Sequence, residues 1–160
     1  MKQTCIITLL LFLCHITASA QNKLVEKYCD LDGVTCISIS KAMLNVISND
    51  DIDIQAEGME LGKIIKKLDG LQILTTEESA NIKKITSELN FSKANGYTEL
   101  MRIKEDDEKT FIYQKKLNET RNEFILMVTE GNIAENTGEL TIIVLTGTIS
   151  IQDIQQALIK

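Results

Sequence analysis

Four hydrophobic runs in the C-terminal part of the sequence constrain the fold more than any other feature. They lie near Tyr97 to Lys104, Lys109 to Lys116, Glu123 to Glu130 and Glu139 to Thr148, and polar turns such as Glu105 to Glu108 separate them. Short runs rich in β-branched and aromatic residues, at regular spacing, predict consecutive β-strands. We therefore expect an antiparallel meander in this region.

Both faces of the expected meander are strongly hydrophobic. Successive side chains of a strand point to opposite faces of its sheet. Alternation assigns one face to Met101, Phe111, Tyr113, Phe124, Leu126, Val128, Leu140, Ile142 and Val144, and the other face to Leu100, Ile112, Ile125, Met127, Ile143 and Leu145. A sheet with one solvated face would instead alternate apolar with polar residues. Either the chain's own helices cover both faces, or the second set forms an interaction face for a protein partner or a second copy of the chain.

The rest of the sequence predicts helices and two further strands. A capping box, in which a Ser or Thr side chain and an acidic side chain cap each other's backbone, marks two helix starts. The expected elements are a short helix at Leu24 to Tyr28, a strand at Val34 to Ser40, a helix with Met43, Leu44 and Ile47, a helix with Leu61, Ile64, Ile65 and Leu68, a strand at Leu71 to Thr75, a helix capped by Thr75 and Glu78, and a last helix capped by Ser150 and Asp153. Residues 21–160 thus predict a single α+β domain, with a mixed sheet of about six strands ending in the antiparallel meander and several packed helices.

Residues 1–20 have the order of a cleavable secretory signal peptide. Lys2 supplies the positive charge, Cys5 to Ile16 the apolar run, and Ala18 to Ala20 the small residues of a cleavage site before Gln21. An apolar run of this length is shorter than the roughly 20 residues that cross a bilayer. We therefore expect an exported protein (periplasmic, envelope-associated or secreted) with no stable transmembrane segment after cleavage.

Composition removes several classes of function. The net charge of −6 argues against binding to nucleic acid, which needs a basic surface. The single histidine, His15, lies in the expected signal peptide, so the mature chain lacks the usual general base and the commonest metal ligand. We expect no catalytic residue of the Ser–His or Cys–His type, no metal site and no cofactor.

Two hypotheses of function remain. The first is a non-catalytic envelope or secreted protein that binds another macromolecule. The second is a His-free hydrolase that uses paired carboxylates. We favour the first, because carboxylate catalysis needs a cleft with apolar or aromatic walls, and only 4% of the residues are aromatic.

Cys29 and Cys36 are the two cysteines that remain after the expected signal peptide. Export would place them in an oxidising compartment, where the turn between them could bring them together as a disulfide. They could equally be two small thiols that fill the core. Both interpretations stay open at the level of sequence.

Two local patterns resemble active sites but have simpler explanations. Ser38 and Lys41 have the S-x-x-K spacing of penicillin-binding enzymes, yet the companion motifs of those enzymes are absent. Asp30 and Asp32 precede Gly33 like the start of a calcium loop, but the rest of such a loop is missing. We interpret the first pattern as a strand followed by a helix, and the second as a turn.

Four segments carry a resemblance to a known family. They are Gly33 to Met43, Lys67 to Thr75, Glu99 to Asp106 and Leu145 to Ile154. Together they resemble the domain-of-unknown-function 4252 family of exported Bacteroidota proteins. The resemblance covers nearly all of the mature chain, but its motifs are structural junctions, so it implies no functional residue. Many family members look like lipoproteins, and this sequence departs from them because Leu13 precedes Cys14 where a lipid-attachment motif would have a small residue.

Overall fold

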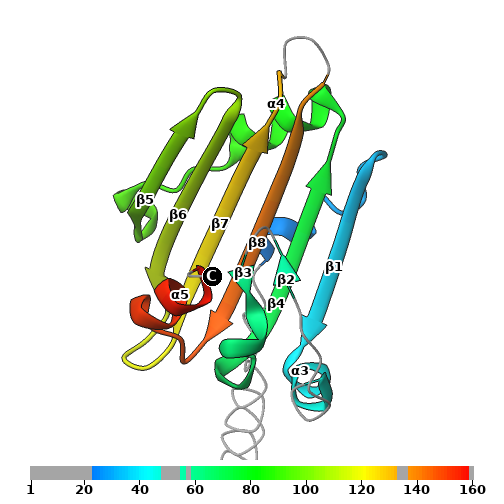
Figure 1. Cartoon of the computed structure of the whole chain (residues 1–160). Coiled ribbons are helices and arrows are strands. Elements are labelled where there is room, and N and C mark those ends of the chain that lie inside the picture. The colour runs from blue at the N-terminus through cyan, green and yellow to red at the C-terminus, as the bar shows by residue number, and fades with distance from the viewer. Residues whose placement is uncertain (1–22, 48–54, 57–58, 133–136, 159–160) are drawn as a thin grey trace, which may run out of the picture.

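Six strands form one sheet, in the order β1-β4-β8-β7-β6-β5 (Figure 1). The computed structural model describes residues 23–47, 55–56, 59–132 and 137–158. The strands are β1 (Val34–Ser40), β4 (Leu68–Thr76), β5 (Tyr97–Glu105), β6 (Glu108–Lys116), β7 (Asn122–Glu130) and β8 (Glu139–Gly147).

The α+β class and the meander of β5 to β8 are confirmed. All neighbouring strands are antiparallel, so the expectation of a mixed sheet was wrong: β4 lies between β1 and β8 and runs opposite to both.

Helices and turns lie on both faces of this sheet (Figure 1). The helices are α2 (Lys23–Glu26), α3 (Lys41–Ile47), α4 (Ser79–Glu88) and α5 (Ile151–Leu158). A second, two-stranded sheet is formed by β2 (Gln55–Ala56) and β3 (Met59–Glu60), and 3₁₀ turns occur at η2 (Leu61–Lys63), η3 (Ile65–Lys67) and η4 (Lys93–Asn95).

The predicted cap of the last helix is confirmed. Ser150 Oγ accepts the Asp153 amide at 3.2 Å, and the Asp153 carboxylate accepts the Ser150 amide at 2.8 Å. Lys67 Nζ also lies 2.6 Å from this carboxylate. The hydrogen bond from Lys67 holds the pKa of Asp153 below its ordinary value against the opposing effect of burial, and Ser150 adds to the lowering. The start of α5 is therefore fixed to the turn that precedes β4.

The helix expected at Leu61 to Leu68 is replaced by the two 3₁₀ turns η2 and η3. The apolar residues of this segment are buried, as the helical spacing indicated. Leu68, however, pairs with Gly147 as the first residue of β4, and the Lys67 carbonyl accepts the Thr148 amide at 2.9 Å. The last residue of the expected helix is therefore part of the sheet. Gly62, a poor helix former, lies in the first turn of the segment and also disfavours a helix there.

The cap predicted for the next helix was also wrong. Thr75 remains within β4, paired with Thr35 on one side and Thr141 on the other. The helix α4 begins later, at Ser79, and the side chain of Thr76 accepts the Glu78 amide at 3.3 Å. Strand pairing therefore continues past the residue that could have capped the helix.

Both faces of the sheet are covered by the chain itself. On one face, residues of β4, β6, β7 and β8 pack against α3, β3, η2, η3 and α5. On the other face, residues of β4, β6, β7 and β8 pack against α2 and α4. Of the two alternatives that the sequence left open, the structure has the self-covered sheet.

The predicted interaction face does not exist as a single exposed surface. Leu100, Ile112, Ile143 and Leu145 belong to the first core, whereas Ile125 and Met127 belong to the second. Ile143 is fully buried, and Ile112 and Leu145 nearly so. The register explains the error, because Ile112 lies opposite Leu126 and Leu126 opposite Ile143, which places Ile125 on the other face. Both alternating sets of β7 are apolar, so alternation alone does not show which set faces which core.

The predicted signal peptide, residues 1–20, lies outside the described residues. Within the described part of the chain, no helix has the length and apolar character needed to cross a membrane.

Candidate functional site at the sheet edge

The strand β1 forms one edge of the six-stranded sheet and pairs only with β4 among the described strands. Its sequence, VTCISIS, contains no charged residue and no proline. Alternate residues of an antiparallel edge strand direct their amide and carbonyl groups away from the sheet. Such an edge is a template for another strand unless charges, proline or a bulge protect it.

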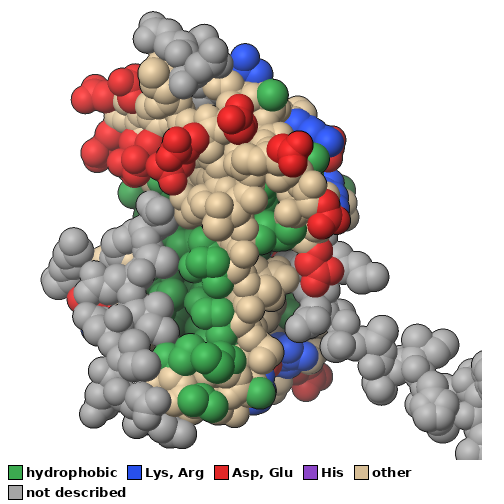
Figure 2. Space-filling view, turned by 90° about the vertical axis from the view of Figure 1, so that its right-hand side faces the viewer, with side chains coloured by type: hydrophobic (Ala, Val, Ile, Leu, Met, Phe, Trp, Pro, Cys, Tyr) green, Lys and Arg blue, Asp and Glu red, His purple; other side chains and the backbone are tan. Residues whose placement is uncertain are grey.

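Exposed hydrophobic side chains accompany this edge. Ile37, at the midpoint of β1, is 49% exposed, and Met43 and Val46 of the following helix α3 are 53% and 55% exposed. Figure 2 looks onto the side of the molecule where β1 lies, and it shows hydrophobic side chains gathered in its lower half below a group of acidic ones. We call β1 together with Ile37, Met43 and Val46 the β1 edge.

The N-terminal end of β1 is held by polar contacts and a disulfide. Thr76 Oγ1 donates to the Gly33 carbonyl at 2.7 Å, and Asn81 Nδ2 donates to the Asp32 carbonyl at 2.8 Å. Cys29 and Cys36 form a disulfide, with sulfur atoms 2.08 Å apart and Cα atoms 5.6 Å apart. The bond fastens β1 to the turn that follows α2.

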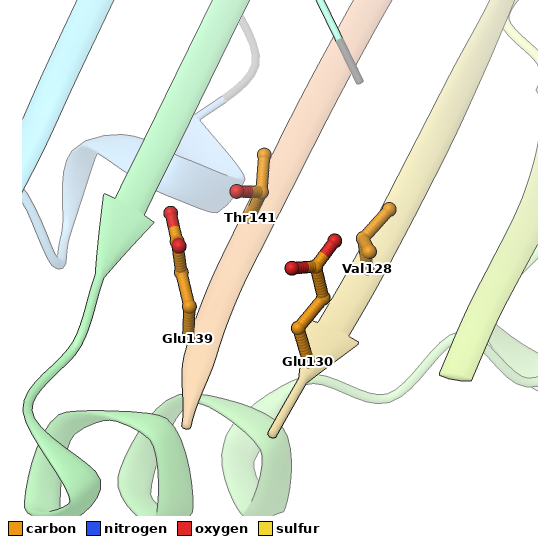
Figure 3. Close-up of a pocket in the computed structure, with 4 residues that line it drawn as sticks. All are labelled: Val128, Glu130, Glu139 and Thr141. Carbon is orange, nitrogen blue, oxygen red and sulfur yellow. The ribbon is translucent and has the colours of Figure 1, made fainter. Parts of the chain in front are cut away.

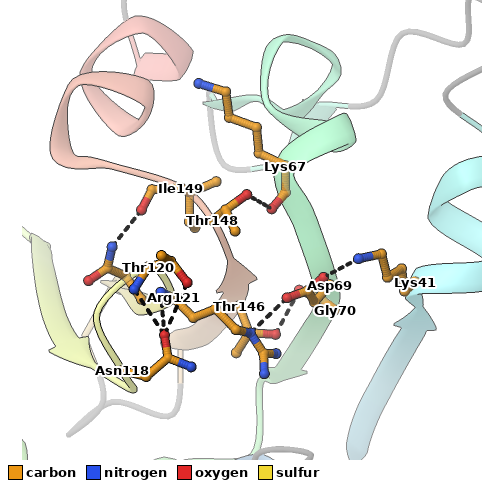
Figure 4. Close-up of polar contacts among 11 residues, drawn as sticks. Lys41, Lys67, Asp69, Gly70, Asn118, Thr120, Arg121, Thr146, Thr148 and Ile149 are labelled. Atoms are coloured by element: carbon orange, nitrogen blue, oxygen red, sulfur yellow. Dashed lines mark hydrogen bonds and ion pairs between the residues drawn. The ribbon is translucent and has the colours of Figure 1, made fainter.

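The C-terminal end of β1 is held through Asp69. Lys41 Nζ lies 2.7 Å from one carboxylate oxygen of Asp69, and Arg121 Nε lies 2.8 Å from the other (Figure 4). Partial burial raises the pKa of Asp69, but the Lys41 hydrogen bond and the Arg121 charge outweigh it and leave the pKa below its ordinary value. The ionised carboxylate thus joins α3, β4 and the turn between β6 and β7.

Asn118 shapes that turn so that Arg121 can reach Asp69. Its side-chain oxygen accepts the amides of Thr120 and Arg121, at 3.0 and 2.8 Å (Figure 4). An asparagine that binds the backbone a few residues ahead is a common device for fixing a turn. The β1 edge is therefore held at both ends before any partner arrives.

The opposite edge of the sheet, β5, has a different character. It carries Glu99, Arg102, Lys104 and Glu105, and its register shifts between Glu99 and Met101. Arg102 binds Glu99 at 2.7 Å. Charges and an irregular register are features by which natural edge strands avoid further pairing.

Tyr97 anchors the first residue of β5 to the core. Its hydroxyl donates to the Glu123 carboxylate at 2.7 Å, and both residues are buried. Burial raises the pKa of Tyr97, and the hydrogen bond to Glu123 raises it further. The tyrosine therefore remains a neutral donor, and this pair is a structural contact.

A pair of carboxylates lies where β7 ends and β8 begins. Glu130 and Glu139 are cross-strand partners, and with Val128 and Thr141 they line a hollow of about 120 Å³ (Figure 3). Pockets for small ligands usually have volumes of roughly 300–1,000 Å³ and apolar walls. This hollow is smaller and has no aromatic wall, so it gives little support to the carboxylate hydrolase.

The remaining sequence-based candidates do not converge on one site. Ser38 lies on β1, but Lys41 is engaged with Asp69. Among the described residues no group of three or more His, Cys, Asp or Glu side chains could hold a metal ion. Ile37 was not singled out from the sequence, and Met43 was grouped with Leu44 and Ile47 as a residue of the expected helix. The absence of charge over Val34–Ser40 was the signal that could have identified this edge.

Comparison with solved structures finds weak similarity to Mog1. A mutant of the protein Mog1 and the Saccharomyces cerevisiae Ran-binding protein Mog1p are each 10% identical to this chain, with a TM-score of 0.32. The alignments cover 67% of this chain and 61% and 60% of the Mog1 chains, which is less than two thirds of their length. A TM-score this low does not establish a shared fold.

No curated protein is significantly similar to the sequence. The profile of one family, described as a domain of unknown function (DUF4252), matches residues 28–157, from the last buried residue before the disulfide to the last helix. This match spans all six strands of the sheet, both ends of the β1 edge, the helices α3 and α4, and all of α5 except its last residue; α2 lies before it. The chain therefore belongs to the DUF4252 family.

Proposed function

We propose that this protein is an exported, non-catalytic protein that binds another protein by adding a strand to the β1 edge. The observation that carries the proposal is the contrast between a sheet edge without charges, lined by exposed Ile37, Met43 and Val46, and an opposite edge with four charged residues. In strand addition, backbone hydrogen bonds supply affinity, and side-chain contacts on alternate residues supply specificity.

The rigidity of the β1 edge also supports binding. An edge strand that frays would lose conformational entropy each time a partner ordered it. Here the disulfide to Cys29, the contacts at Asp32 and Gly33, and the Lys41–Asp69 pair hold the strand before binding. The partner therefore meets a preformed template.

Export is supported by the signal-like residues 1–20 and by the disulfide. Disulfides persist mainly outside the reducing cytosol. N-terminal sequencing of protein from the producing organism tests this part of the proposal, with a start at or near Gln21 expected. A retained Met1 would contradict it.

Site-specific photo-cross-linking tests the binding part. A photo-reactive amino acid replaces Ile37 in one variant and Met101 in a second, because both are large apolar residues at opposite edges, 49% and 41% exposed. We expect a protein adduct from position 37 in the producing host and none from position 101. Hydrogen exchange of β1 amides should also slow in the complex. Equal labelling at the two positions, or none at either, would exclude the β1 edge as the binding site.

A further inference from the structure

We propose that the partner at the β1 edge is a second copy of this chain, paired antiparallel to the first about a two-fold axis at Ile37. The inference rests on the proposed function, since it names the occupant of the same edge. A two-fold interface requires one surface to be complementary to itself, so that residue i meets j and j meets i. The β1 edge meets this requirement in its backbone, its side chains and its charges.

The length and sequence of β1 favour pairing about its midpoint. With the axis at Ile37, all seven residues of the strand find a partner in the other copy. Thr35 then faces Ile39, Cys36 faces Ser38 and Val34 faces Ser40 of the partner copy. None of these pairs places like charges opposite each other, an arrangement that would weaken antiparallel pairing.

Ile37 gives the strongest side-chain argument. It ends a cross-strand row that runs from Ile73 through the fully buried Ile143. Directly opposed side chains in an antiparallel pair lie close enough to pack. In the dimer, Ile37 would contact Ile37 of the partner subunit, and the apolar row would continue from one subunit into the next. The exposed half of each Ile37 side chain would thereby be buried.

The charges at the two ends of β1 select the antiparallel orientation. Exposed Asp32, Glu77 and Glu78 surround the N-terminal end, whereas Lys41 lies at the C-terminal end with 64% of its side chain exposed. Near the acidic end is an open hollow of about 260 Å³, lined by Gly33, Glu77 and Glu78 among others. Antiparallel pairing brings the partner subunit's Lys41 beside Gly33 and this acidic end. Parallel pairing would bring acidic ends together.

The size of the edge predicts a weak, reversible dimer. We expect a seven-residue strand pair with Met43 and Val46 of α3 beside it to bury less than the roughly 1,200–2,000 Å² of stable interfaces. We therefore expect a dissociation constant on the order of micromolar, as in transient complexes.

Cysteine cross-linking measures the register directly. Opposed residues of an antiparallel pair have Cα atoms roughly 4.5–5.5 Å apart, within the range a disulfide can bridge. On mild oxidation of protein purified from the producing host, Ile37→Cys should give at least about tenfold more covalent dimer than the matched variant Met101→Cys at the other edge. Peptide mass mapping must show a link between the two positions 37, with Cys29–Cys36 intact.

Sedimentation of uncross-linked variants provides the second measurement. Ile37→Lys should weaken self-association at least tenfold, because the axis would place two lysines opposite each other. Met101→Lys should leave it unchanged, and circular dichroism should show that both variants stay folded. Wild-type protein that remains monomeric at several hundred micromolar, or Ile37→Cys that cross-links no more than Met101→Cys, would overturn the proposal.

These outcomes separate the inference from the proposed function. If a photo-reactive residue at position 37 labels a different protein while Ile37→Cys gives no dimer, the second copy is excluded and strand addition stands. If position 37 labels nothing and no dimer forms, both fall.

Discussion

The two edge strands of the sheet, β1 and β5, lie at opposite ends of one row of cross-strand neighbours, but they differ in charge and regularity. The row begins at Ile37 on β1, crosses Ile143 in the centre, and ends at Met101 on β5. At β5, four charged residues and a register shift oppose further pairing. At β1, the strand is regular, uncharged and held at both ends. Only β5 carries the usual protection of an edge strand, and this difference points to β1 as the binding edge.

The largest effect is expected at the centre of this row. Ile143→Lys places a charge in a fully buried position with no partner, and we expect a loss of about 3–5 kcal/mol in the free energy of unfolding. Urea denaturation measures it. The control Ile143→Val, which removes one methyl group, should cost about 0.5–1.5 kcal/mol. A Lys variant as stable as the Val variant would mean that this face is not the core described above.

The next effect concerns the disulfide at the β1 edge. Replacing both Cys29 and Cys36 with serine removes a disulfide that closes a short loop, because the two cysteines are seven positions apart. Chain-entropy estimates for such a loop give a loss of about 2.5 kcal/mol in the free energy of unfolding. Amide exchange should increase in β1 and stay unchanged in β5. Reduction of the wild-type protein serves as the control and should give the same pattern. A uniform increase across the sheet would show that the bond stabilises the whole domain rather than the edge.

A smaller, pH-dependent effect is expected at the other end of β1. Asp69→Asn removes the ion pairs with Lys41 and Arg121 and should cost about 1 kcal/mol at neutral pH. Because the pKa of Asp69 is lowered in the folded protein, its contribution is present above the ordinary pKa of 3.8 and is lost as the pH falls through the folded-state pKa.

Urea titrations of wild type and Asp69→Asn from pH 7 to pH 2 check this sign. The two stabilities should converge at the acid end. At the β5 edge, Arg102→Ala removes a solvent-exposed ion pair with Glu99, and we expect it to leave the free energy of unfolding nearly unchanged across this pH range. A gap between wild type and Asp69→Asn that widens in acid would contradict the assigned role of Asp69.

The smallest effects on stability are expected at the two ends of the row. Ile37→Lys and Met101→Lys replace partly exposed side chains, so each should change the free energy of unfolding by no more than about 0.5 kcal/mol. Thermal unfolding of dilute protein measures both. Equal stabilities with unequal association would show that the edges differ in binding and not in folding. A large loss for Ile37→Lys alone would mean that Ile37 is part of the core.

Much of the local structure follows from the sequence alone. The meander of β5 to β8, the strand β1 and the cap formed by Ser150 and Asp153 depend on nearby residues: short apolar runs, turn residues and a hydroxyl three positions before a carboxylate. The sequence also showed that both faces of the sheet are apolar. These features need no knowledge of distant contacts.

The tertiary structure decided what depends on distant pairing. Ile125 and Met127 face the second core because β7 pairs in one particular register. The helix expected from Leu61 does not form, because Leu68 pairs with Gly147 as part of β4. The position of β1 in the sheet makes it an edge, because β4 is its only neighbour among the described strands. A one-residue change of register exchanges the faces of a strand without changing its sequence. For this reason, composition and alternation determined which residues are apolar, and only the pairing of strands determined which of them meet and which remain at the edge.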